Sequence, residues 1–145
     1  MNINGCLGKK FLTKTKPDND LIEKEFAEAE YDLEKAEKAF DDEDYKWAIV
    51  KSYYCIFHAA RAMLFKLGLK ENRHFAIGVV LEDLNKNGKL ESKYVNQFNA
   101  AISSREDADY HYIYSNETAA YNLQIAQDFL ERMKKLIKVL AEGNL

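Results

Sequence analysis

Apolar residues recur along this chain at steps of three and four, the spacing that places side chains on one face of an α-helix. The pattern predicts four long helices, over about 20–40, 45–69, 90–113 and 115–143, and a shorter one over about 74–84. The second long helix carries apolar residues around most of its circumference, which is typical of a helix at the centre of a bundle. We therefore predict an all-α fold, an up-and-down helical bundle of four long helices plus one shorter helix.

Polar segments predict where these helices begin and end. The acidic run Asp41–Asp44 ends the first helix and supplies a cap to the next. Asn85–Gly88 ends the shorter helix, and Ser115 or Asn116 caps the last one. Gly143 is placed where a helix often terminates.

Residues 1–19 show no apolar period and are predicted to form a flexible basic N-terminal arm. Residues 20–145 then form the helical bundle as one domain. The arm would be held, if at all, through Phe11 and Leu12. It could touch phosphate groups or simply stay solvated. Its positive charge comes from Lys9, Lys10, Lys14 and Lys16.

Composition narrows the classes of function. The formal net charge is −3, so no overall positive field would attract nucleic acid, and any RNA contact must be local. Cys6 and Cys55 make neither a disulfide framework nor a metal cluster, which favours a reducing cytoplasm. No apolar run resembles a signal peptide or reaches the roughly 18 residues of a membrane span. We expect a cytoplasmic protein that does not enter membranes.

The apolar stripe of the fourth predicted helix is interrupted by charge. The count of three- and four-residue steps that starts at Val95 continues to Arg105, Asp109 and Tyr112. Removing a charge from water is unfavourable unless the charge is paired or used. The segment Arg105–His111 is therefore a candidate site.

Two segments give the chain a resemblance to the HEPN domain family. They are Ala48–Leu64 (AIVKSYYCIFHAARAML) and Ser104–Tyr110 (SREDADY). The resemblance implies a helical bundle that pairs as a homodimer. Many HEPN domains are metal-independent ribonucleases, and small ones are often toxins restrained by a minimal nucleotidyltransferase. Their catalytic motif is an arginine, four to six residues and a histidine, which Arg105 and His111 satisfy.

Metal-independent RNA cleavage needs a base, an acid and a cation beside phosphate. His111 could serve as base or acid, and Arg105 could bind phosphate oxygens, so no cofactor or metal is required. Along an unbroken helix the two side chains would diverge by about 120°. Either the helix bends or ends near Tyr110, or a two-fold dimer supplies the second copy of each residue, which we favour.

The tyrosines around the motif admit two interpretations. Tyr110, Tyr112 and Tyr114 could stack RNA bases, or they could pack in the core or at an interface.

A structural interpretation of the charged residues stays open. Arg105 and Asp109 are spaced to pair on one helix. Arg61, on the apolar face of the second long helix, could instead neutralise Asp107 or Asp109 across the bundle. The cluster would then fix helix register, as in a purely structural adaptor.

A non-catalytic binding module is the second functional hypothesis. Active members often have a small polar residue after the arginine and a tyrosine two residues after the histidine, where this chain has Glu106 and Ile113. Such a module would dock a nucleotidyltransferase or a nucleotide. His58 and His74 are interpreted as structural, because neither has a partner at metal-ligand spacing.

Overall fold

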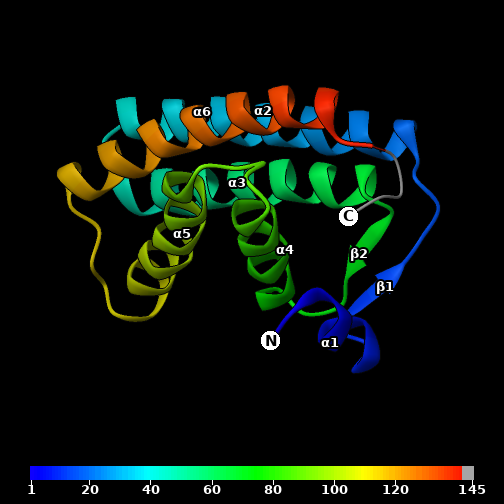
Figure 1. Cartoon of the computed structure of the whole chain (residues 1–145). Helices are drawn as coiled ribbons and strands as arrows, with labels where there is room; N and C mark the ends of the chain where they lie inside the picture. The colour runs from blue at the N-terminus through cyan, green and yellow to red at the C-terminus, as the bar shows by residue number, and fades with distance from the viewer. Residues whose placement is uncertain (142–145) are drawn as a thin grey trace.

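The computed structural model describes residues 1–141, so the predicted stop at Gly143 lies outside the described residues (Figure 1). Six helices and one small sheet make up this part of the chain. In order, the elements are α1 (Ile3–Gly8), β1 (Leu12–Lys14), α2 (Asn19–Asp41), α3 (Tyr45–Lys66), β2 (Leu69–Glu71), α4 (Phe75–Lys86), α5 (Ser92–Tyr110) and α6 (Asn116–Val139). The predicted all-α fold is confirmed.

The central position predicted for the second long helix is also confirmed. The α3 helix packs against α2, α5 and α6, and α2 and α6 run along it in Figure 1. The shorter α4 and the motif-bearing α5 descend steeply from this layer. Apolar side chains of α3 are buried on several faces, because other helices cover them. They include Ile49, Tyr53, Ile56, Ala60, Met63 and Leu64.

The predicted caps are present at the starts of α3 and α6. The Asp44 carboxylate accepts a hydrogen bond from the Trp47 backbone N–H at 3.2 Å. The Ser115 hydroxyl accepts one from the Thr118 N–H at 3.1 Å, so Ser115 and not Asn116 caps α6. Each cap satisfies a backbone donor that the first helical turn leaves without a partner.

The N-terminal residues correct the expectation of a loose arm. Residues 3–8 form α1, and β1 pairs antiparallel with β2, with Leu12 opposite Glu71. Ile3, Cys6 and Leu12 are buried in the main core. Elements this short carry no sequence period, so only tertiary contacts reveal them.

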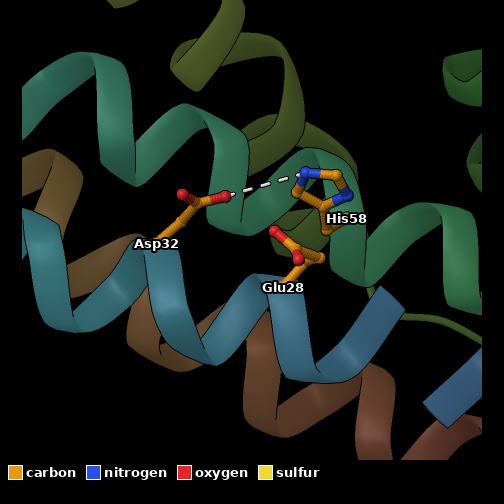
Figure 2. Close-up of side chains that lie close together, drawn as sticks. All are labelled: Glu28, Asp32 and His58. Carbon is orange, nitrogen blue, oxygen red and sulfur yellow. Dashed lines mark ion pairs between the residues drawn. The ribbon is translucent and has the colours of Figure 1, made fainter. Parts of the chain in front are cut away.

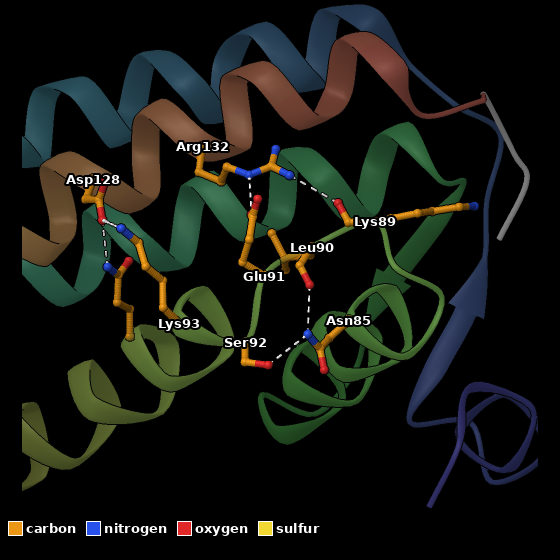
Figure 3. A network of polar contacts seen from close by, with 9 residues as sticks. Asn85, Lys89, Leu90, Glu91, Ser92, Lys93, Asp128 and Arg132 are labelled. Atoms are coloured by element: carbon orange, nitrogen blue, oxygen red, sulfur yellow. Dashed lines mark hydrogen bonds and ion pairs between the residues drawn. The ribbon is translucent and has the colours of Figure 1, made fainter.

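Hydrogen bonds hold the segment between α4 and α5, residues 87–91, against α6 (Figure 3). Arg132 Nε donates to Glu91 at 2.8 Å, and Arg132 Nη2 donates to the Lys89 carbonyl at 3.1 Å. The first of these hydrogen bonds lowers the pKa of Glu91. Asn85, near the end of α4, donates to the Leu90 carbonyl at 2.8 Å. These contacts fix where α5 begins.

Among residues 1–141, none of the helices combines the length and apolar character needed to cross a membrane.

Candidate functional site

The candidate motif occupies the C-terminal end of α5. The helix ends at Tyr110, and His111 is its C-cap. The Asp107 carbonyl accepts hydrogen bonds from the backbone N–H groups of both His111 and Ile113, at 3.0 and 3.1 Å. Tyr112, between them, has a φ of 59°, in the left-handed region that non-glycine residues seldom enter. The sequence left open whether the helix bends or ends near Tyr110. The structure shows that it ends there.

Arg105 lies along the half-buried side of α5. Its Nε is 3.3 Å from Asp109 Oδ2, an ion pair between residues four apart on one helix. Its guanidinium carbon lies over the Tyr53 ring of α3, 5.2 Å from the ring centroid. Burial raises the pKa of Tyr53, and the Arg105 charge partly offsets that effect. Arg105 is thus oriented by its own helix and by one aromatic ring.

His111 projects from the end of the helix, and 64% of its side chain is exposed. Its Nδ1 lies 3.0 Å from Asp107 Oδ1. A proton on Nδ1 would donate to that carboxylate and leave Nε2 with a free lone pair. This arrangement orients an accessible imidazole that could accept or deliver a proton.

Aromatic side chains surround this end of α5 and are exposed. These aromatic residues are Tyr110, Tyr112 and Tyr114. The aliphatic Ile113 between them is exposed as well. Their exposure contradicts the alternative that the three tyrosines pack in the core of the chain. They remain free to contact a ligand or another protein.

Arg61 does not pair with Asp107 or Asp109, and both of those expectations are wrong. Its Nη1 lies 3.2 Å from Glu25 Oε1 of α2, and its Nε lies 3.3 Å from Glu71 Oε1 of β2. The side chain emerges from the face of α3 that meets α2 and β2, which is not the face that meets α5. Arg61 therefore belongs to a structural contact and not to the candidate site.

A second polar cluster lies between α2 and α3, and sequence reasoning missed it (Figure 2). Ligand atoms of Glu28, Asp32 and His58 all lie within 4.8 Å of one another. The three residues could therefore hold a metal ion. Spacing along the chain gave His58 no ligand partner, because its two neighbours come from another helix.

The α2–α3 cluster did leave a signal in the sequence. Glu25, Glu28 and Asp32 are three and four residues apart, so they share one face of a helix. His58 and Arg61 share a face of the following helix in the same way. Antiparallel packing of the two helices would bring these faces together, which is what the ion pairs across them require.

Comparison of the sequence with models of protein families identifies the family. The family model of the HEPN domain matches residues 22–143. The chain belongs to the HEPN family. This confirms the resemblance carried by the motif segments.

Three archaeal relatives extend the match. Two proteins of Methanocaldococcus jannaschii, named "Putative toxin MJ0142" and "Putative toxin MJ0605", are 27% and 31% identical to this HEPN chain. The alignments cover 80% and 76% of the chain and 81% and 84% of those proteins. A "UPF0332 protein" of Archaeoglobus fulgidus is 27% identical, over 81% of this chain and 96% of its own length.

The two candidate motif residues each pair with a nearby carboxylate. Arg105 contacts Asp109 in the last turns of α5, and His111, the C-cap of the helix, contacts Asp107. The sequence analysis predicts Asp107 only as a partner for Arg61, although a spacing of four residues from His111 is a signal for the observed pair. Tyr53, whose ring packs against the Arg105 guanidinium, belongs in the sequence to an apolar stripe of the second long helix. Nothing in that spacing predicts its contact with Arg105.

Proposed function

We propose that this HEPN protein is a ribonuclease-type toxin of the cytoplasm that cleaves RNA without a metal. It would act as a homodimer and be restrained by a nucleotidyltransferase-like partner. The observation that carries the proposal is the placement of Arg105 and the exposed His111 at one end of α5. The toxin names of the two Methanocaldococcus relatives support the toxin part of this assignment.

The chemistry follows from the two side chains. A base removes the proton of the ribose 2′-hydroxyl, whose oxygen then bonds to phosphorus as the bond to the 5′-oxygen breaks. The leaving oxygen takes a proton from an acid, and a 2′,3′-cyclic phosphate remains. His111 has the imidazole for either proton transfer. Arg105 would stabilise the charge that grows on the phosphate oxygens.

A homodimer would complete this site. Each chain brings one His111, whereas the reaction needs both a base and an acid. A two-fold axis near the end of α5 would place two imidazoles and two guanidinium groups around one phosphate. The exposed Tyr110 and Tyr112 would then lie at the rim, where they could stack bases or contact the second chain.

The decisive experiment uses purified protein and RNA in EDTA. We expect cleavage by the native chain and a loss of about 100-fold or more in His111→Ala, because general acid–base groups contribute on this scale. The Tm should stay unchanged, since the side chain is mostly exposed. His74→Ala, at the start of α4, is the matched control and should cleave normally. Cleavage by His111→Ala at the native rate would contradict the proposal.

A non-catalytic HEPN binding module, docking a nucleotidyltransferase or a nucleotide, is the alternative. It is favoured by the acidic partners that Arg105 and His111 already have, and by Glu106 and Ile113 in the motif. This version predicts a stoichiometric complex with a nucleotidyltransferase and no RNA cleavage by the free protein. RNA cleavage in EDTA that depends on His111 would reject it.

A further inference from the structure

We propose that Glu28, Asp32 and His58 bind one divalent transition-metal cation that joins α2 to α3. The site is separate from the candidate ribonuclease residues of α5 and takes no part in their chemistry. It is built from two helices, with both carboxylates on α2 and the imidazole on α3. A bound ion would therefore stabilise the contact between these two helices.

The His58 ring is already held in the orientation of a ligand. Its Nδ1 lies 2.6 Å from Glu25 Oε2, so a proton on Nδ1 donates to that carboxylate. In that neutral tautomer the other nitrogen, Nε2, would keep its lone pair, and it faces Asp32 Oδ2 at 3.7 Å (Figure 2). A carboxylate behind a histidine is the usual second contact of a metal-bound imidazole, because it fixes the tautomer and raises the basicity of the ligand.

The distance between these two atoms suits a shared cation better than a hydrogen bond. At 3.7 Å, Nε2 and Oδ2 are too far apart for a normal hydrogen bond. Two ligand atoms of a tetrahedral zinc ion, each about 2.1 Å from the metal, lie about 3.4 Å apart. A rotation that moves the two atoms together by a few tenths of an ångström would complete that geometry.

Asp32 keeps one oxygen for this role although it is buried. Its Oδ1 pairs with Lys51 at 3.1 Å, whereas its Oδ2 is turned toward His58. The side chain is 6% exposed, so it is held in place by the surrounding helices. Lys51 thus neutralises part of the carboxylate without occupying the oxygen that faces the imidazole.

Glu28 supplies the third ligand from the solvent side. Within residues 1–141 its carboxylate takes part in no ion pair or hydrogen bond, and in Figure 2 it lies beside the Asp32 and His58 side chains. The residue is exposed, which leaves an entry path for the ion and room for water in the remaining coordination position.

Where α2 meets α3, the carboxylates of this cluster outnumber the lysine and arginine side chains that pair with them. On α2, Glu25, Glu28 and Asp32 face the cations Lys51 and Arg61 of α3, and Arg61 is also shared with Glu71 of β2. A divalent cation would offset this excess. One imidazole with two carboxylates favours Zn²⁺, Co²⁺ or Mn²⁺ over Mg²⁺, which prefers oxygen ligands only.

The test measures thermal unfolding of the full chain with added ZnCl₂ and with EDTA. At a free Zn²⁺ concentration of about 100 times Kd, we expect the Tm to rise by about 5–10 °C. Glu28→Gln should lose most of this rise while its Tm in EDTA stays native, because Glu28 is exposed and has no ion pair within the described residues. Glu34→Gln, an exposed glutamate of the same helix outside the cluster, is the matched control and should keep the rise.

A second measurement assigns the ligand atom. In ¹⁵N NMR of the histidine rings, Zn²⁺ should shift Nε2 of His58, and His111→Ala should leave that shift and the Tm rise intact. The proposal is overturned if Zn²⁺ leaves the native Tm unchanged, if Glu28→Gln keeps the full rise, or if the shift falls on another histidine. None of these outcomes depends on RNA cleavage, which is measured in EDTA.

Discussion

Two arginines of this HEPN domain have almost the same exposed fraction but different carboxylate partners. Arg61 is 23% exposed and Arg105 is 27% exposed, and each guanidinium rests on an aromatic ring. Arg61 joins three elements, because its two carboxylate partners come from α2 and β2. Arg105 pairs only with Asp109 of its own helix.

The difference separates a structural charge from a functional candidate. The partners of Arg61 are 12% and 10% exposed, so water cannot replace the arginine if it is removed. Asp109 is 26% exposed and can be solvated without Arg105. A local pair of this kind holds a guanidinium in position while leaving it able to exchange its partner for a phosphate.

The largest effect is expected from removing the charge of Arg61. Arg61→Met keeps the apolar stem but leaves Glu25 and Glu71 without their shared cation. We expect the free energy of unfolding to fall by about 3 kcal/mol, measured by urea denaturation. The exposed Arg73→Met is the control and should change it by no more than about 0.5 kcal/mol. A similarly small loss for Arg61→Met would remove the distinction between the two arginines.

A smaller effect on stability is expected at Arg105. Arg105→Met should reduce the free energy of unfolding by about 1 kcal/mol, since it loses a local ion pair and the contact with the Tyr53 ring. In a double-mutant cycle with Asp109→Asn, the coupling should be about 0.3–0.5 kcal/mol. RNA cleavage, in contrast, should fall by about 100-fold. A coupling above about 2 kcal/mol would make Arg105 a structural residue like Arg61.

The smallest effect is expected at Glu91, an exposed carboxylate that also pairs with an arginine. Because Arg132 lowers the pKa of Glu91, the folded state favours the charged form. The pair therefore stabilises the fold above the unfolded pKa, near 4.5, and this contribution disappears as the pH falls through the lower, folded pKa. We expect Glu91→Gln to lose less than about 1 kcal/mol at pH 7.

Urea denaturation at several pH values checks this expectation. The difference between native protein and Glu91→Gln should shrink as the pH is lowered from 7 toward 3. A difference that is independent of pH would mean that the carboxylate charge contributes nothing.

The long helices could be predicted because each repeats its apolar period over several turns, and their ends carry recognisable caps such as Asp44 and Ser115. The α1 helix and the β1–β2 pair could not, since elements of three to six residues are too short to show a period. The motif itself was visible, because charge at Arg105 and Asp109 interrupts an apolar stripe.

The sequence alone determined the helical class, the central place of α3 and the spacing that lets Arg105 pair with Asp109. These depend on spacing along one helix, which the order of residues defines completely. Only the tertiary structure decided that Arg61 meets Glu25 and Glu71, and that His58 meets Asp32. Those partners are distant in the chain. Which carboxylate each side chain meets depends on how α2 and β2 are placed against α3, and packing of the whole core determines that placement.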